Sequence, residues 1–501
     1  MSTDVVTEKH GFWHMPKTFY AVLFIEFWER FAFYGLQAVA VLFFIQKFGL
    51  KESQATDLFS SFSALLYALL ILGGYLGDKI LGLRRTYLLG IIFLMLGYGS
   101  FGVVSKVHLL YWGMGMVLVG NIFFKTNAGN FVSRCFKPTD PRLDSAFTYF
   151  YMSINLGSLF SIIIIPLISQ RTSYGFGISL CGVGMFISLL SYLVLRKYFV
   201  MSDNDTGRNA GNKLILMLFI SAAAIVLSYG LGLLLSNPAL SRKLLFSFAA
   251  AVLLVYLVVR FKLKEPFERR GMTIALILLF QSILFFIMYM QMSTSLTLFA
   301  VHNVRNEIFG FSIPAEITQS FNPFYIFLLS PILATLYVRS EHKGSPISIP
   351  GKFAFGMLVC GAAYLLLAGS CYYLSDANAT ISMLWLFLGY GLYSLGELLI
   401  SAIGLSMVSK LMPARLGGFA QASWFMASAM GMKFGGMMAG FGSADSGKVM
   451  SNLDILHSYQ NLFLYIGIGA TVVALFLFCF VKPLAKAMRE VMEHKERAEA
   501  V

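Results

Sequence analysis

The sequence predicts an all-α integral membrane protein that crosses the bilayer fourteen times. Hydrophobic residues make up 58% of the 501 positions and charged residues only 12%. An ordinary soluble domain has about 25% charged residues. Apolar stretches of about 20 residues, the length of a helix that crosses a bilayer, recur along the whole chain, and the loops between them are short. No segment has the composition of a soluble domain.

Each predicted span is an apolar run between polar or charged loop residues. The first six spans are expected at 18–47, 56–77, 85–105, 108–134, 143–170 and 174–197, and a pair follows at 213–236 and 240–262. Six more are expected at 271–301, 316–338, 350–375, 382–410, 416–441 and 459–482. An even number of spans puts both termini on the same side of the membrane.

This order of spans predicts two six-helix bundles around a central site, as in transporters built from internal repeats. We expect the first bundle at 1–200, a linker with the inserted helix pair at 201–265, and the second bundle with a cytoplasmic tail at 266–501. The inserted pair is rich in Leu, Ala and Val, which favours a lipid-facing or inter-bundle spacer over a binding role.

The distribution of Lys and Arg predicts the orientation of the chain. Of the 38 basic residues, 27 lie on the side of the N-terminus and 8 on the opposite side, and the others are inside spans. Because an excess of Lys and Arg marks the cytoplasmic side, both termini are expected in the cytoplasm. The net charge of +14 is explained by these loop ends and by anionic lipid headgroups, so no nucleic-acid partner is expected.

The chain carries no pattern of a processed, disulfide-bonded or metal-binding protein. The N-terminal segment lacks a cleavable signal pattern. The five cysteines have no CxxC pair and no metal spacing, so no disulfide framework or metal site is expected. Nucleotide-binding and catalytic motifs are also missing from the sequence, which disfavours an enzyme. Uphill transport would therefore draw on an ion gradient, and we expect the proton as the coupling ion.

A charged cluster in the first span is the most informative local feature: it consists of Glu26, Glu29 and Arg30. Ionisable residues at this depth are costly unless they face a bundle interior or a watery cavity and have partners. At 3.6 residues per turn, Glu26 stacks over Arg30 and Glu29 lies on the same broad face. Two carboxylates around one guanidinium can pass a proton. The alternative is a neutral ion triad that only fixes helix packing.

Two further deep charges, Lys125 and Glu397, come from opposite halves of the chain and would suit the two ends of a small zwitterion. We expect Lys433 to extend toward the periplasmic membrane surface. Pro323 can kink the tenth span. Uncharged polar side chains inside the spans could line a pocket, although helix–helix contact is the ordinary role of any single one: they are Tyr34, Tyr67, Tyr151, Asn155, Asn322 and Trp424.

The loop between the second and third spans is rich in glycine, and Asp78 lies in it close to Arg84 and Arg85. The glycines permit a tight turn and close helix approach, and the acid can form an ion pair that breaks when the bundles move. This pattern resembles the loop signature of the major facilitator superfamily. A solvated turn is the alternative.

The first and fifth spans carry sequence motifs that resemble the proton-dependent oligopeptide transporter (POT) family, most closely its bacterial dipeptide and tripeptide permeases. The stretch from Glu26 to Gly35 matches the motif ExxERFxYYG at all but one position. The stretch from Phe150 to Ser161 matches FYxxINxGSLxS. Further matches at 124–127, 321–323 and 396–405 extend the resemblance over nearly the whole chain.

This resemblance implies a major facilitator fold and a proton-coupled symporter that imports di- and tripeptides by alternating access. It implies a small peptide and membrane lipid as partners, no cofactor beyond the proton, and action as a monomer in the bacterial inner membrane. The implied proton-coupling residues are Glu26, Glu29 and Arg30. The implied substrate-binding residues are Arg30 and Lys125 for the carboxylate, Asn155, Asn322 and Glu397 for the amino terminus, and Tyr34, Tyr67 and Trp424 for side chains.

The sequence departs from the family pattern at three places. Phe33 replaces the first Tyr of the usual pair, Ala402 replaces a Pro, and Gln37 stands where many members have Arg. The ninth span also has no acid, so the periplasmic ion pair of those members cannot form. The alternative function is a major facilitator proton symporter for another small anionic or zwitterionic solute, such as nitrate or an amino-acid derivative. A membrane receptor is disfavoured because the sequence has no sensory domain.

Overall fold

The computed structural model describes residues 15–136, 142–199, 210–308, 310–342, 347–442 and 450–499. Long helices follow one another along this part of the chain. They are α1 (Lys17–Phe48), α2 (Glu52–Tyr75), α3 (Leu83–Val103), α4 (Val107–Arg134), α5 (Arg142–Arg171), α6 (Tyr174–Leu195), α7 (Ala210–Ser236), α8 (Pro238–Lys262), α9 (Pro266–Gln291), α10 (Ser295–Asn303), α11 (Phe321–His342), α12 (Ile349–Tyr373), α13 (Met383–Leu411), α14 (Gly417–Gly442) and α15 (Asn452–Glu499).

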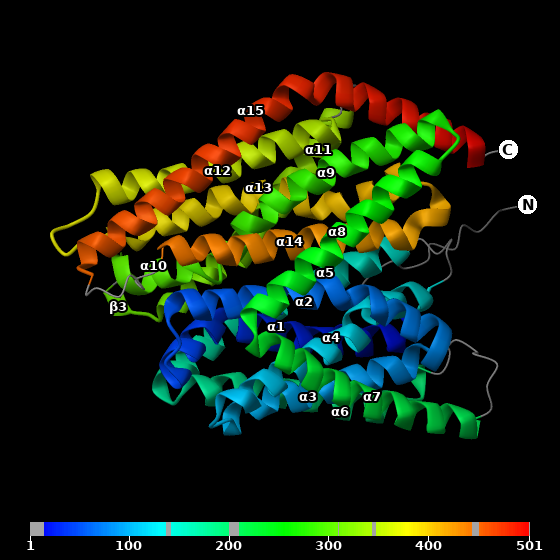
Figure 1. Cartoon of the computed structure of the whole chain (residues 1–501), viewed down its shortest axis with the longest axis horizontal. Helices are drawn as coiled ribbons and strands as arrows, with labels where there is room; N and C mark the ends of the chain where they lie inside the picture. The colour runs from blue at the N-terminus through cyan, green and yellow to red at the C-terminus, as the bar shows by residue number, and fades with distance from the viewer. Residues whose placement is uncertain are drawn as a thin grey trace, which may run out of the picture. The chain divides into compact units, whose positions relative to one another are not determined.

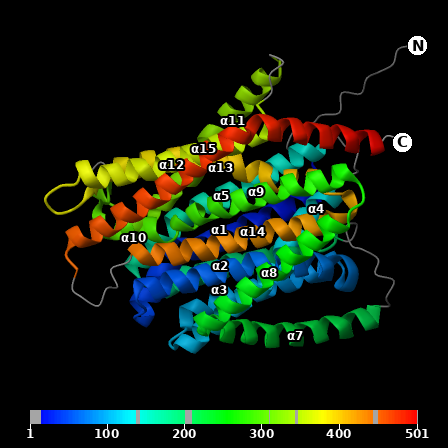
Figure 2. The same ribbon diagram turned by 45° about the horizontal axis from the view of Figure 1, so that its top comes forward.

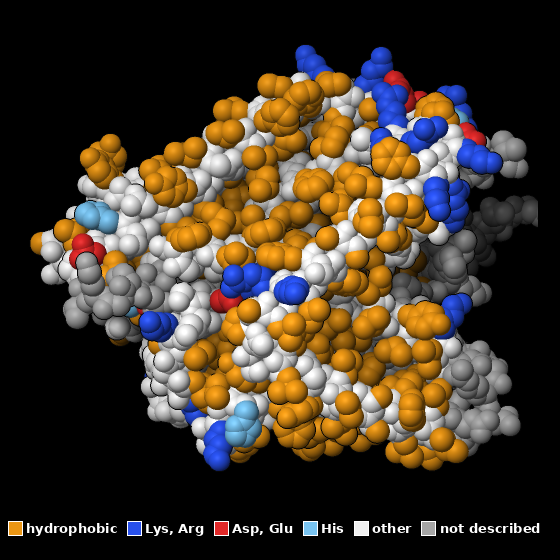
Figure 3. All heavy atoms as spheres, in the orientation of Figure 1, with side chains coloured by type: hydrophobic (Ala, Val, Ile, Leu, Met, Phe, Trp, Pro, Cys, Tyr) orange, Lys and Arg blue, Asp and Glu red, His pale blue; other side chains and the backbone are white. Residues whose placement is uncertain are grey.

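Thirteen helical segments among the described residues are long and apolar enough to cross a membrane. They confirm the prediction of an all-α membrane protein. The predicted span 416–441 forms α14, which is not among the thirteen because its glycines, its serines and Lys433 lower its mean hydropathy. Hydrophobic side chains cover most of the face seen over α8, α9 and α15 (Figure 3). Such a surface is suited to lipid.

The chain divides into two compact units. The first comprises Met1–Leu36, Leu72–Ser161 and Gly175–Gly232, and the second comprises Gln37–Ile71, Ile162–Tyr174 and Leu233–Val501. In the first unit, α3 packs along α4 because glycines let the two backbones approach. A Cβ on Gly90 would lie 2.8 Å from Phe124 Cβ, and one on Gly120 would lie 2.7 Å from Leu94 Cγ.

In the second unit, α12 packs along both α13 and α15, and α9 packs along α14. Figure 1 shows α15 in red beside α12. Figure 2 shows α8 crossing α14, its neighbour in the second unit. The Tyr256 hydroxyl of α8 donates to the Met272 carbonyl of α9 at 2.7 Å. The other inserted helix, α7, packs in the first unit, where a Cβ on Gly115 would lie 1.9 Å from the Ser228 carbonyl oxygen. The domain boundaries expected above stay a prediction.

The ninth predicted span, 271–301, is not one continuous helix. It ends as α9 at Gln291 and resumes as α10 at Ser295, because polar side chains bind the backbone groups freed at the break. Thr294 Oγ1 donates to the Met290 carbonyl at 2.7 Å, and Thr297 Oγ1 donates to the Met292 carbonyl at 2.8 Å. Beyond α10, β1 (Val304–Arg305) pairs with β4 (Ile381–Ser382), and β2 (Glu307–Ile308) pairs with β3 (Phe311–Ser312).

Two expectations about helix shape were wrong. Pro323 does not kink a helix, because a 3-10 turn at Ala315–Ser320 precedes it and α11 begins at Phe321. Proline is tolerated there because the first turn has N–H groups without helical partners. The last helix also continues far beyond its predicted end at 482, since Ala487, Met488 and Val491 bury an apolar face of α15.

Candidate functional site

The charged residues of α1 lie together inside the first unit. As their spacing predicts, Arg30 Nε donates to Glu26 Oε1 at 2.7 Å, and it lies 3.1 Å from Glu29 Oε2. Both glutamates are fully buried and Arg30 is 9% exposed. One guanidinium thus neutralises part of the charge of two carboxylates in the membrane-spanning part of the chain.

Lys125 of α4 completes this group, and the four residues Glu26, Glu29, Arg30 and Lys125 are called the α1–α4 cluster below. The ammonium lies 3.9 Å from Glu29 Oε1 and donates to Asn121 Oδ1 at 3.5 Å. It also lies 3.7 Å from the centroid of the Phe33 ring. Phe33 therefore contributes a cation–π contact to Lys125, because an aromatic face attracts a cation at this distance.

The α1–α4 cluster holds carboxylate oxygens that lack strong donors. Glu26 Oε2 and both Glu29 oxygens accept no hydrogen bond within the described part of the chain. Buried polar atoms of this kind are uncommon, and each calls for a water, an ion or a catalytic or transport role. The arrangement can accept a proton or exchange an ion partner at Glu29.

The motif in the fifth span explains how α5 reaches this cluster. A Cβ on Gly157 would lie 2.5 Å from the Phe27 carbonyl oxygen and 3.0 Å from Arg30 Cβ, so only glycine lets α5 lie this close to α1. Asn155, two residues away, is half-buried and donates to the Tyr151 carbonyl at 2.8 Å. Tyr34 is also half-buried, and its ring lies edge-on to Phe33 with centroids 5.1 Å apart.

A second candidate site lies in the second unit, where α11 meets α13. Asn322 Nδ2 donates to Glu397 Oε2 at 2.7 Å and to Ser394 Oγ at 3.0 Å. Asn322 is 8% exposed, and Glu397 is half-buried. The structure therefore joins two residues that the sequence placed far apart, and it adds Ser394, which no motif singled out. A carboxylate held by an amide at this depth can bind an ammonium group.

Trp424 and Tyr67 also belong to the second unit. A Cβ on Gly404 would lie 1.9 Å from Trp424 Cη2, so the glycine at the end of the matched segment 396–405 makes room for the indole. Trp424 packs edge-on against Phe286, and Tyr67 lies near Phe425 with ring centroids 6.4 Å apart. These contacts fit a pocket wall and fit ordinary helix packing equally well.

The glycine-rich loop is only partly described. The side chain of Asp78 lies outside the described residues, so its predicted ion pair with Arg84 or Arg85 stays a prediction. Arg85 donates to the Leu81 carbonyl at 3.4 Å, and Tyr192 donates to the Arg84 carbonyl at 3.1 Å.

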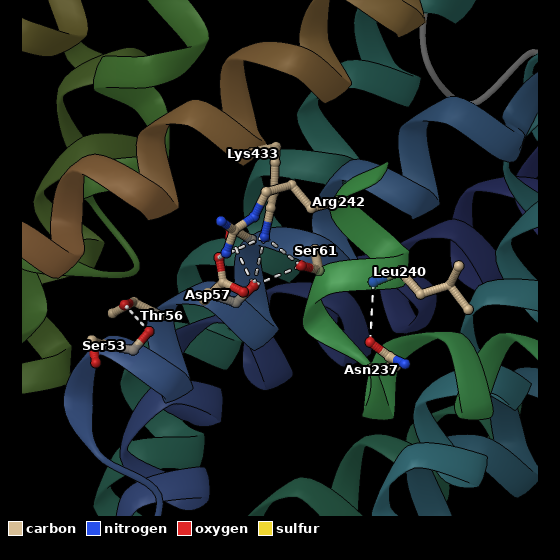
Figure 4. A network of polar contacts seen from close by, with 9 residues as sticks. Ser53, Thr56, Asp57, Ser61, Asn237, Leu240, Arg242 and Lys433 are labelled. Carbon is tan, nitrogen blue, oxygen red and sulfur yellow. Dashed lines mark hydrogen bonds and ion pairs between the residues drawn. The ribbon is translucent and has the colours of Figure 1, made fainter. Parts of the chain in front are cut away.

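The expectation that Lys433 extends toward the membrane surface was wrong. Lys433 is fully buried, and its ammonium lies 2.6 Å from Asp57 Oδ1 and 2.6 Å from Ser61 Oγ, as Figure 4 shows. Asp57 lies near the start of α2, and no sequence motif singled out this residue.

Comparisons with known proteins agree with these motifs. A model of the POT family matches residues 80–452. Dipeptide and tripeptide permease B of Xenorhabdus bovienii is 38% identical over 485 residues, which cover 97% of this chain and 99% of the relative. Permease A of Edwardsiella piscicida is 37% identical over 464 residues, which cover 92% and 93% of the two chains.

Solved structures of peptide transporters share the fold. A bacterial homologue of human drug peptide transporters has a TM-score of 0.80 and 33% identity, over 94% of this chain and 99% of that one. A peptide transporter solved with sulfate has a TM-score of 0.83 and 26% identity, over 95% and 97%. These likenesses confirm the predicted fold class and a multi-pass membrane protein.

Proposed function

The chain belongs to the POT family, and from this membership we propose that it is a proton-coupled symporter that imports di- and tripeptides by alternating access. The observation that carries the proposal is the buried α1–α4 cluster, in which Glu29 lies between Arg30 and Lys125. The relatives compared above are named permeases, so the proposed chemistry is transport and not the conversion of a substrate.

In this proposal, proton coupling depends on competition for the cations of the cluster. When Glu26 and Glu29 are ionised, they occupy Arg30 and compete for Lys125. Protonation of one glutamate removes a negative charge and frees cationic donors for the carboxylate of a peptide. Proton and peptide carboxylate therefore bind together better than either binds alone. The proton is the only coupling partner proposed, and no cofactor is required.

The second unit supplies the other end of the proposed substrate contact. Glu397, held by Asn322, would bind the amino terminus of the peptide. Charged residues would then bind both termini of the zwitterionic peptide, and apolar and aromatic residues would contact its side chains. Tyr34, Asn155, Tyr67 and Trp424 are the proposed lining residues, in addition to the charged ones.

We further propose a monomer in a bacterial inner membrane with both termini in the cytoplasm. The basis for the orientation is the excess of Lys and Arg in loops on the side of the termini, and the bacterial permeases compared above support the inner membrane. One solved neighbour is tetrameric in its crystals. Detergent-solubilised protein examined by light scattering would decide between a monomer and such an assembly.

The function is tested with purified protein in liposomes. An inward proton gradient should drive accumulation of labelled dialanine above its external concentration, and unlabelled tripeptide should compete while single amino acids should not. Protein-free liposomes and a proton ionophore are the controls. Accumulation of nitrate without accumulation of dialanine would instead establish the alternative solute, and accumulation of neither would contradict the proposal.

A further inference from the structure

A second buried ion cluster lies in the second unit, and none of its residues is among the proposed substrate contacts. Lys433 of α14 donates to Asp57 Oδ1 and Ser61 Oγ of α2, each at 2.6 Å, and to the Asp57 carbonyl at 3.4 Å. All three donors of the ammonium therefore have acceptors on α2. Lys433 is fully buried and the Asp57 side chain is only 17% exposed.

The inserted helix α8 contributes a second cation to the same carboxylate. Arg242 Nη2 lies 3.8 Å from Asp57 Oδ1, and its side chain is 43% exposed. Figure 4 shows Arg242 and Lys433 converging on Asp57 from two different helices. Asp57, Ser61, Lys433 and Arg242 are called the distal cluster, because they lie toward the membrane face where α1 ends and α2 begins, opposite the N-terminus.

The backbones of α2 and α14 are in direct contact beside the distal cluster. A Cβ on Gly436 would lie 2.1 Å from Ser60 Cβ, so glycine is required for this packing. Other contacts of the second unit join the two halves of the chain near the same face: Glu52 with His302 at 2.6 Å, and the Ala38 carbonyl with Gln319 at 3.0 Å. The distal cluster is thus one of several contacts that join helices of the first six spans to helices of the last six spans.

We propose that the distal cluster is a latch that keeps the distal entrance of the transport path closed, and that α8 braces this latch through Arg242. The proposal rests on the proposed alternating access. For the distal entrance to open, α2 and α14 must separate, and Lys433 must then lose Asp57 and Ser61 inside the membrane. The proposed latch would take the place of the periplasmic ion pair that cannot form here, because residue 37 is Gln and the ninth span has no acid.

The relative size of the effects follows from burial. Removing one partner of a buried ion pair leaves an uncompensated charge, which is costly. Asp57→Asn or Lys433→Gln should therefore weaken the closed state strongly. Arg242 is partly exposed and farther from the carboxylate, so solvent screens its contribution. Arg242→Gln should have a smaller effect in the same direction.

The rate of disulfide formation between α2 and α14 reports how much of the protein has the distal entrance closed. A Cβ on Gly440 of α14 would lie 3.7 Å from Ser53 Cβ of α2, which is the spacing of a disulfide. Ser53→Cys with Gly440→Cys is introduced into the full chain after its five cysteines have been replaced. The rate of disulfide formation in membranes under a mild oxidant is then followed by alkylation of the remaining thiols.

We expect Lys433→Gln and Asp57→Asn each to slow disulfide formation by roughly tenfold or more, and Arg242→Gln by about two- to threefold. The matched control is Lys243→Gln, which removes the same charge from the exposed neighbour of Arg242 and should leave the rate unchanged. The double variant Asp57→Asn with Lys433→Gln should be no slower than the slower single variant, because both remove the same interaction.

Unchanged rates in both single variants, or multiplicative slowing in the double variant, would overturn the latch. An effect of Arg242→Gln no larger than that of Lys243→Gln would overturn the role of α8. Lys433→Arg keeps the charge, and it should retain most of the rate if the other variants fold poorly. The disulfide rates are measured without substrate. If they change as expected but the protein accumulates no dialanine, the proposed function is overturned and the latch is not.

Discussion

The α1–α4 cluster and the distal cluster both place a lysine with little exposed surface against a carboxylate, yet their geometry differs. Lys125 lies 3.9 Å from Glu29, whereas Lys433 lies 2.6 Å from Asp57 and has Ser61 as a further acceptor. The distal lysine is saturated with partners. In the α1–α4 cluster, three carboxylate oxygens accept no hydrogen bond from the described residues.

The two clusters show that one chain can use buried charge in two ways. A saturated pair resists separation, because every donor that leaves its acceptor is exposed to an apolar surrounding. An under-coordinated pair loses less when a proton or a ligand replaces one partner. The first arrangement suits holding two helices together, and the second suits exchange.

Glu29→Gln should abolish accumulation of dialanine driven by a pH gradient. The amide keeps the size of the side chain but can no longer bind and release the proton. Exchange of labelled for unlabelled peptide without a gradient can survive, because it needs no net proton movement. The measurement is uptake into proteoliposomes with and without the gradient.

The matched control is Glu265→Gln. It is the same substitution at the residue that precedes α9, and the Glu265 side chain makes no hydrogen bond that caps this helix. It should leave accumulation unchanged. If Glu29→Gln still concentrates dialanine against its gradient, the α1–α4 cluster acts in structure and not in coupling.

Glu397→Gln should erase most of the preference for peptides with a free amine over their N-acetylated forms. A charge-assisted contact contributes roughly 1.5 to 3 kcal/mol, so the parent protein should prefer the free amine by about tenfold or more. Competition of both forms against labelled dialanine gives the ratio. A parent-like ratio in the variant would show that Glu397 does not bind the amino terminus.

Lys125→Ala should weaken binding of peptides with a free carboxylate by roughly fivefold relative to peptide amides, less than a full charge-assisted contact because Arg30 remains. Inhibition constants for a dipeptide and its amide supply the comparison. Lys410→Ala, at the end of α13 and far along the chain from the cluster, is the control. Equal losses for the dipeptide and the amide would indicate a structural lysine.

The sequence was sufficient for the fold class and for the local geometry of α1. Apolar length predicts the spans, and helical spacing predicts that Glu26 and Arg30 meet, because both depend on a single helix. It was insufficient for contacts between helices. The hydrogen bond from Asn322 to Glu397 depends on how α11 packs against α13. The residue pattern within either helix does not indicate which residues meet between the two helices.

Lys433 and Pro323 show why two expectations failed. Lys433 was expected to extend toward the membrane surface, but its partner Asp57 lies on a different helix, α2, and no pattern within α14 indicates that contact. Pro323 was placed inside a helix because its neighbours are apolar, although the chain before it forms a 3-10 turn and the helix begins only at Phe321. In both cases the missing information was tertiary packing.

The smallest expected effect concerns Phe33, whose ring lies 3.7 Å from the Lys125 ammonium. Cation–π attraction contributes about 0.5 to 1 kcal/mol at exposed sites and more when desolvated, so Phe33→Leu should raise the KM for dialanine by about two- to fivefold. Phe33→Tyr keeps the aromatic face and should leave KM unchanged. In a Lys125→Ala background, Phe33→Leu should have no further effect, because the cation is already absent. Equal KM changes in the Leu and Tyr variants would mean that the ring only fills space, and the weak anchoring of Lys125 would then depend on Asn121 and Glu29 alone.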